Sequence, residues 1–99
     1  MGDPESQIKL PPSELWSQIA KLAIVEDKPI MLDYWADSVK KEVLIGVKKE
    51  ADEKLLVKNA EEYTSPIIKI YKISGCYIIC TENSIYLVSA DIPTKYIND

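Results

Sequence analysis

The chain has 99 residues, of which 46% are hydrophobic and 28% charged, and its net charge is −4. This size and composition predict one globular domain, and the acidic balance disfavours non-specific attraction to nucleic acid or anionic membranes. The chain lacks histidine and arginine, the usual general base and the usual phosphate-binding group, so we expect no catalytic residue, no metal, no cofactor and no enzyme activity.

Residues 1–10 are predicted to form a flexible polar tail. The first six residues, MGDPES, are unlike a signal peptide, and they match the N-myristoylation pattern M-G-x-x-x-[ST]. Acylation of Gly2 and a plain polar leader are therefore both open. Residues 11–92 are predicted to form a single compact domain, and residues 93–99 a polar C-terminal tail.

A helix is predicted to begin near Ser13 and Glu14, which suit an N-cap and the positive end of a helix. Apolar residues then recur at helical spacing, at Leu15, Ile19, Leu22 and Ala23. The helix ends before Pro29, because the residue that precedes a proline avoids the α region.

After Pro29 the apolar residues alternate, which is typical of strands. The predicted strands are residues 30–35, 42–48, 54–58, 67–73, 76–81 and 84–89. The links are short and polar, with turn residues at Ser74-Gly75 and Asn83. The predicted fold is therefore mainly β (α+β): an N-terminal helix followed by five or six short antiparallel strands that form a small barrel or a strongly bent sheet.

The two cysteines, Cys76 and Cys80, fall in one predicted strand. Four residues along a strand separate their Cα atoms by about 13 Å, whereas a disulfide needs roughly 4.4–6.8 Å. We therefore expect two apolar thiols in the cytoplasm or another reducing intracellular compartment. No apolar run approaches the length of about 18 residues that a membrane-spanning helix needs, so no membrane partner is expected.

The Thr64-Ser65-Pro66 tripeptide resembles a proline-directed phosphorylation site. It lies in the longest polar link of the predicted domain. Phosphate on Ser65 would add negative charge beside Glu61 and Glu62 and would favour loosening of this link. Whether Ser65 is modified is left open by the sequence.

Three segments resemble Sm and Sm-like (LSm) proteins. The first Sm motif is similar to Val43-Leu44-Ile45-Gly46 followed by Asp52, its closing strand to residues 55–62, and the second motif to residues 79–88. The resemblance covers about residues 11–90 and implies an Sm-like small β-barrel. Lys54 replaces the base-contacting asparagine of the family and Thr81-Glu82 its Arg-Gly, so the resemblance implies ring assembly or partner binding through strand edges.

Residues 62–67 and 81–89 also resemble short uncharacterised proteins of large DNA viruses. This second resemblance implies a virus-encoded accessory or structural protein. It implies no particular activity.

We expect a small interaction or assembly module that acts through protein–protein contacts, with a protein partner or as a homo-oligomer. The last three predicted strands carry apolar residues on both faces, which is more area than one helix can cover, and an open strand edge can bind a partner. Aromatic and apolar residues are the interface candidates: Trp16, Trp35, Ile68, Ile70, Tyr71, Ile79, Tyr86 and Val88.

The alternative function is single-stranded RNA or DNA binding by an Sm-like protein. Such binding needs an aromatic platform with basic neighbours. Lys48, Lys69, Tyr71 and Lys72 are the candidate residues.

Overall fold

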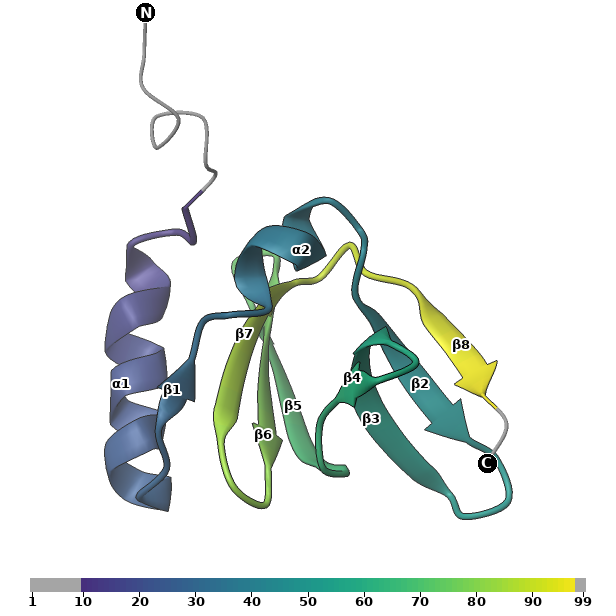
Figure 1. Cartoon of the computed structure of the whole chain (residues 1–99). Coiled ribbons are helices and arrows are strands. Elements are labelled where there is room, and N and C mark those ends of the chain that lie inside the picture. Colours follow the sequence, from purple (N-terminus) through teal and green to yellow (C-terminus); the bar gives the residue numbers. More distant parts are fainter. Residues whose placement is uncertain (1–9, 98–99) are drawn as a thin grey trace, which may run out of the picture.

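The computed structural model describes residues 10–97, which form two helices and two four-stranded sheets (Figure 1). Sheet A has the strand order β1-β7-β6-β5 and sheet B the order β4-β3-β2-β8. In chain order the elements are α1 (Glu14–Glu26), β1 (Ile30–Met31), α2 (Trp35–Val39), β2 (Leu44–Lys48), β3 (Glu53–Asn59), β4 (Glu62–Tyr63), β5 (Ile67–Ile73), β6 (Cys76–Thr81), β7 (Ile85–Ser89) and β8 (Thr94–Ile97).

Helix α1 confirms the predicted N-terminal helix, and it is held to sheet A at both ends. Leu15 and Ile19 are its buried residues. The Ser74 hydroxyl donates a hydrogen bond to the Glu14 carboxylate at 2.7 Å. Beyond the other end of the helix, Lys28 Nζ donates to the Thr81 carbonyl at 2.7 Å. The helix therefore runs alongside β6 and covers one face of sheet A.

Sheet A is buried on both faces. Alternate residues of β6 and β7 enter a core beneath α1, which contains Leu15, Ile19, Trp35, Cys76, Ile78, Cys80, Ile85 and Leu87. The residues between them enter a second core against sheet B, which contains Tyr34, Val43, Ile45, Leu56, Ile79, Val88 and Ile92. The result is three layers, with sheet A between α1 and sheet B (Figure 1).

This arrangement corrects one part of the sequence interpretation. Ile78, Ile79, Leu87 and Val88 are fully buried within the single chain, so these residues need no partner. The alternation predicted strands with two apolar faces correctly, but the second face is covered by sheet B. Burial of each such side chain contributes about 1.5–3 kcal/mol, which favours the two-sided packing.

The predicted barrel or bent antiparallel sheet is wrong, because residues 10–97 form two separate open sheets. Each sheet is mixed: β1 pairs with β7 in parallel and β2 pairs with β8 in parallel. The predicted tail at residues 93–99 contains β8, which is fixed by the buried Ile92 and by the hydrogen bond from Ile45 N–H to the Pro93 carbonyl at 2.9 Å. Of the predicted N-terminal tail, residues 1–9, including Gly2, lie outside the described residues.

The predicted strand at residues 30–35 is also wrong beyond Met31, because the chain turns there into the short helix α2. Tyr34 and Trp35 enter different cores. Consecutive residues of a strand would also point to opposite sides, so the sequence pattern did not distinguish the two structures. Buried Ser38 holds α2 in place: its hydroxyl donates to the Trp35 carbonyl at 2.6 Å and accepts from the Ser89 N–H at 2.9 Å. Neither helix of the described chain is long and apolar enough to cross a membrane.

Candidate functional site

The open edge of sheet A is formed by β5, a strand of seven residues. Within residues 10–97, β5 pairs along its length only with β6. Ile68 and Ile70 are 58% and 37% exposed on it. A long edge strand with exposed apolar side chains is a template for pairing with another strand.

The turn between β5 and β6 determines which backbone groups of β5 face the open edge. Ser74 and Gly75 both have left-handed φ, at 52° and 77°, as in a type I′ hairpin turn. The residues that flank such a turn, Ile73 and Cys76, form a hydrogen-bonded pair, and such pairs alternate along an antiparallel ladder. The N–H and C=O groups of Ile70 and Lys72 therefore point away from β6.

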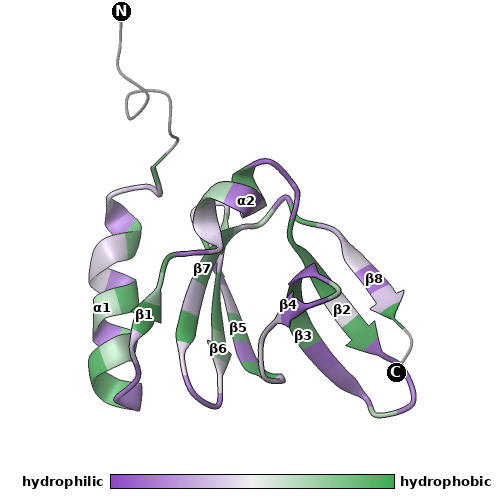
Figure 2. Ribbon diagram, viewed as in Figure 1, coloured by the Kyte–Doolittle hydropathy of each residue, from purple (hydrophilic) through white to green (hydrophobic). Residues whose placement is uncertain are grey.

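A groove of about 360 Å³ lies along the first half of β5. The β2–β3 turn, which is hydrophilic, and the largely apolar first half of β5 both contribute to its lining (Figure 2). Its lining residues are Asp52, Glu53, Lys54, Pro66, Ile67, Ile68, Lys69 and Ile70. We call this hollow the β5 groove. It combines two carboxylates and two lysines with exposed isoleucines, so it suits an extended segment that carries apolar side chains and places a basic side chain near Asp52 and Glu53.

A second hollow, of about 390 Å³, lies on the face of sheet B that points away from sheet A. Its lining is mostly apolar: Lys48, Leu55, Val57, Asn59, Ala60, Tyr63 and Ile97. Gly46 lies beneath it, because a Cβ added there would be 2.9 Å from Ile97 Cδ1. The sequence interpretation missed this hollow because Ile97 was assigned to a tail.

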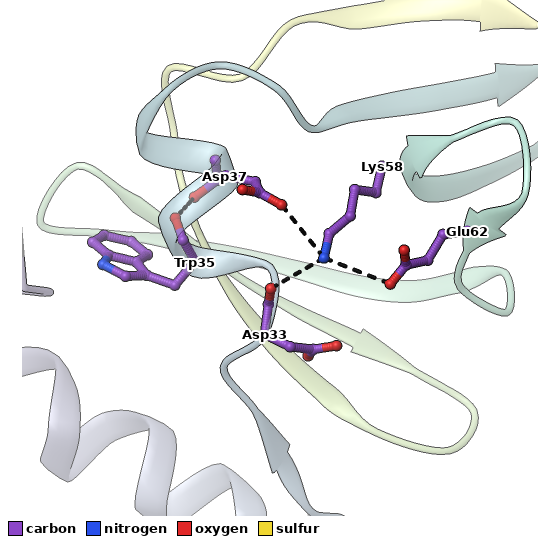
Figure 3. Close-up of polar contacts among 6 residues, drawn as sticks. Asp33, Trp35, Asp37, Lys58 and Glu62 are labelled. Atoms are coloured by element: carbon purple, nitrogen blue, oxygen red, sulfur yellow. Dashed lines mark hydrogen bonds and ion pairs between the residues drawn. The ribbon is translucent and has the colours of Figure 1, made fainter. Parts of the chain in front are cut away.

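Lys58 is the centre of the polar contacts between α2 and sheet B (Figure 3). Its Nζ lies 3.4 Å from an Asp37 carboxylate oxygen and 3.5 Å from a Glu62 carboxylate oxygen, and it donates to the Asp33 carbonyl at 3.3 Å. It also lies 4.6 Å from the centre of the Tyr34 ring. A lysine held by three acceptors and a ring is suited to joining segments rather than to chemistry.

The pKa values of Lys58 and Tyr34 reflect the contacts of each side chain in this cluster. Partial burial acts to lower the pKa of Lys58, but the hydrogen bond to Asp37 and the charges of Glu62 and Asp37 outweigh it and raise the pKa. Burial, together with the charge of Glu62, raises the pKa of Tyr34 to about 12. Lys58 is therefore a cation and Tyr34 a neutral phenol at neutral pH.

Three of the predicted interface residues, Trp35, Ile79 and Val88, lie inside the molecule and are not available to a partner. Tyr86 is half-buried and packs edge-on against Tyr34, with ring centres 5.3 Å apart. The other four are at least partly accessible: Trp16 on α1, and Ile68, Ile70 and Tyr71 on β5. The structure thus brings three of the eight interface candidates together on β5, the open edge strand of sheet A.

The predicted nucleic-acid residues do not form one platform. Lys48 lies on sheet B, whereas the other candidates lie on β5 of sheet A. Lys69 and Tyr71 pair with Cys80 and Ile78, whose side chains face α1, and Lys72 pairs with Tyr77 on the opposite face. The three β5 side chains therefore divide between two faces of the sheet.

The remaining candidate groups are constrained by packing. The thiols of Cys76 and Cys80 are both buried, and burial, assisted by the charge of Glu26, raises the pKa of Cys80. The half-buried Ser65 accepts a hydrogen bond from Asn83 Nδ2 at 3.2 Å. Among residues 10–97, no three histidine, cysteine, aspartate or glutamate side chains gather as a metal-binding group would require.

No protein-family model matches the chain, and neither a curated protein nor a solved structure shows significant similarity to it.

Proposed function

We propose that this protein is a non-enzymatic interaction module that binds a protein partner by strand addition to β5. The observation that supports it best is the exposure of Ile68 and Ile70 on the open edge of a seven-residue strand. Strand addition uses backbone hydrogen bonds for affinity and pockets for alternate side chains for specificity.

Backbone and side chains of β5 both contribute to such binding. The N–H and C=O groups of Ile70 and Lys72 would pair with the added strand, at about 0.5–1.5 kcal/mol for each hydrogen bond. Ile68 and Ile70 would lose their remaining exposure, and a fully buried isoleucine contributes about 1.5–3 kcal/mol. Association also costs translational and rotational freedom, so the isoleucines must add to the backbone hydrogen bonds for the pairing to be specific.

The β5 groove adds a preference for charge. Asp52 and Glu53 line it together with Ile68 and Ile70, and Lys54 and Lys69 complete its charged lining. An extended segment that places a lysine or arginine toward the turn and an apolar side chain toward β5 would satisfy both parts of this lining. We therefore expect the partner segment to be basic and apolar, in keeping with the net charge of −4 on this chain.

A display library of extended decapeptides tests this function. We expect selected peptides to bind the wild type, to perturb the amide resonances of Ile68, Ile70 and Lys72 in NMR titration, and to lose at least about tenfold in affinity with Ile70→Lys. Ile24→Lys is the matched control, because Ile24 is 80% exposed on α1. Peptides that bind Ile70→Lys and the wild type equally, or a library without binders for a wild type that is monomeric, would contradict the proposal.

A further inference from the structure

We infer that the strand that β5 accepts is β5 of a second copy of this chain, in an antiparallel pair with a two-fold axis at Ile70. This inference rests on the proposed function and names its partner. Ile70 is the middle residue of Ile67–Ile73. The pairing of β5 with β6 shifts register between Ile67 and Lys69, so an axis at Ile70 pairs the regular stretch from Lys69 to Tyr71 with its copy. The outward N–H and C=O groups of Ile70 then pair with the same groups of the other chain.

The register about Ile70 is favourable for the three central pairs of facing side chains. Ile70 faces itself, so the apolar side chains that are 37% exposed in one chain cover each other. Lys69 faces Tyr71 of the second copy, where an ammonium group can lie over the ring. Lys72 faces Ile68 of the second copy. No lysine directly faces another lysine in this register.

Other axis positions are less favourable. An axis at Lys69 or at Lys72 would place two lysines directly opposite each other, and like charges in facing positions destabilise a pair of strands. An axis at Tyr71 would set Ile70 opposite Lys72, so the two Ile70 side chains would no longer cover each other. The pattern of β5, IIKIYKI, is therefore most self-complementary about its central isoleucine.

The β5 groove supplies charge complementarity to the same arrangement. Lys72 pairs with Tyr77, so its side chain lies on the face of sheet A that points to sheet B, as the side chain of Ile70 does. In the antiparallel pair, Lys72 of the second copy lies diagonally next to Ile70 on that face. It therefore extends into the groove that Asp52 and Glu53 line. The two-fold axis repeats this contact at the other end of the strand pair. Each dimer therefore contains two contacts between a Lys72 side chain and the groove carboxylates.

Charge exchange at the axis tests the inference by sedimentation velocity. We expect the wild type to form a dimer as its concentration rises, and Ile70→Lys and Ile70→Glu each to raise the dissociation constant at least about tenfold. An equimolar mixture of the two variants should recover the dimer, because lysine then faces glutamate. Ile24→Lys should dimerise as the wild type does, and circular dichroism checks that every variant is folded.

Cysteine cross-linking locates the axis. Facing residues of a hydrogen-bonded antiparallel pair have Cα atoms about 5.5 Å apart, within disulfide range. Ile70→Cys should therefore form a covalent dimer under mild oxidation much faster than Tyr71→Cys or Ile24→Cys. Cross-linking that is faster at Tyr71, or equal at all three positions, would overturn the axis at Ile70.

The outcomes separate this inference from the proposed function. A wild type that stays monomeric at millimolar concentration, yet binds display peptides along β5, would overturn the dimer and keep the interaction module. A monomer without peptide binding would overturn both. A dimer that Ile70→Lys leaves unchanged would place the contact elsewhere and would overturn the dimer through β5.

Discussion

Lys58 joins Tyr34, helix α2 and strands β3 and β4, which come from separate parts of the chain. Its side chain is 18% exposed, and its carboxylate partners Asp37 and Glu62 are 33% and 52% exposed. These partners stay hydrated when the lysine is removed. The ion pairs therefore contribute modestly to stability, as surface ion pairs do.

Lys58→Met should lower the free energy of unfolding by about 1 kcal/mol, measured by urea denaturation at low salt. The methionine keeps much of the aliphatic stem and removes the charge. The loss should shrink in about 1 M sodium chloride, because salt screens such pairs. Lys21→Met, at an exposed position of α1, is the matched control and should change stability by less than about 0.5 kcal/mol. An equal loss in both variants would contradict the role given to Lys58.

Tyr34 predicts a specific loss of stability at high pH. The pKa of Tyr34 in the folded state is raised to about 12 from 10.0. The contribution of its neutral phenol to folding stability is therefore complete below about pH 10. Above it, the unfolded chain loses the phenol proton while the folded chain keeps it, and stability falls. Between about pH 9 and 11.5, the wild type should lose about 2 kcal/mol more than Tyr34→Phe, which does not titrate. Urea denaturation across that range measures the difference, and parallel curves would contradict the assignment.

At the scale of single residues, alternation predicted the burial of Ile78, Ile85 and Leu87 well, because side chains two apart on a strand share a face. It could not predict that Ile79 and Val88 are covered by the chain itself. That outcome depends on sheet B, which lies far away in sequence. Lys58 was not singled out either, because Asp33 and Asp37, two of its three acceptors, lie far from it along the chain.

At the scale of elements, Gly46 controls how β8 is attached to sheet B. A Cβ at this position would lie 2.9 Å from Ile97 Cδ1 and 3.1 Å from Val57 Cγ2. The nearest atom, Ile97 Cδ1, is the end of a flexible side chain, so Gly46→Ala requires only a small shift of the Ile97 side chain. Valine fills more of the space and must displace side chains of two strands.

Gly46→Val should therefore destabilise the protein by about 1–3 kcal/mol, and Gly46→Ala by less. Adding Ile97→Ala to Gly46→Val should recover part of the loss, because the added methyl groups then occupy the space of the removed side chain. Urea denaturation of the single and double variants measures this coupling. Strictly additive losses would show that Ile97 does not pack on Gly46.

The elements that the sequence predicts well are those with local partners. The predicted strands at residues 67–73, 76–81 and 84–89 match β5, β6 and β7 closely, because tight turns connect them. In contrast, β1 and β8 each pair in parallel with a strand far along the chain. The residues of the predicted tail, 93–99, carry no local pattern that predicts the parallel pairing of β8 with β2. The predicted tail and the predicted single sheet were wrong for that reason.

At the scale of the whole molecule, the described residues form three layers. Sheet A is the middle layer, between helix α1 and sheet B. This arrangement buries most apolar side chains of β6 and β7 without a partner. It leaves β5 as an edge with exposed isoleucines next to the charged β2–β3 turn. The expectation of an interaction surface therefore moves from the faces of the sheet to its edge.

Amide hydrogen exchange along β5 tests most directly whether its open edge is an association surface. We expect the amides of Ile70 and Lys72 to exchange rapidly in dilute protein and to become protected as the concentration rises. The Tyr71 amide, which faces β6, should be protected at every concentration. Rapid exchange at Ile70 and Lys72 that does not change up to millimolar concentration, or protection that appears only on α1 or sheet B, would contradict the account.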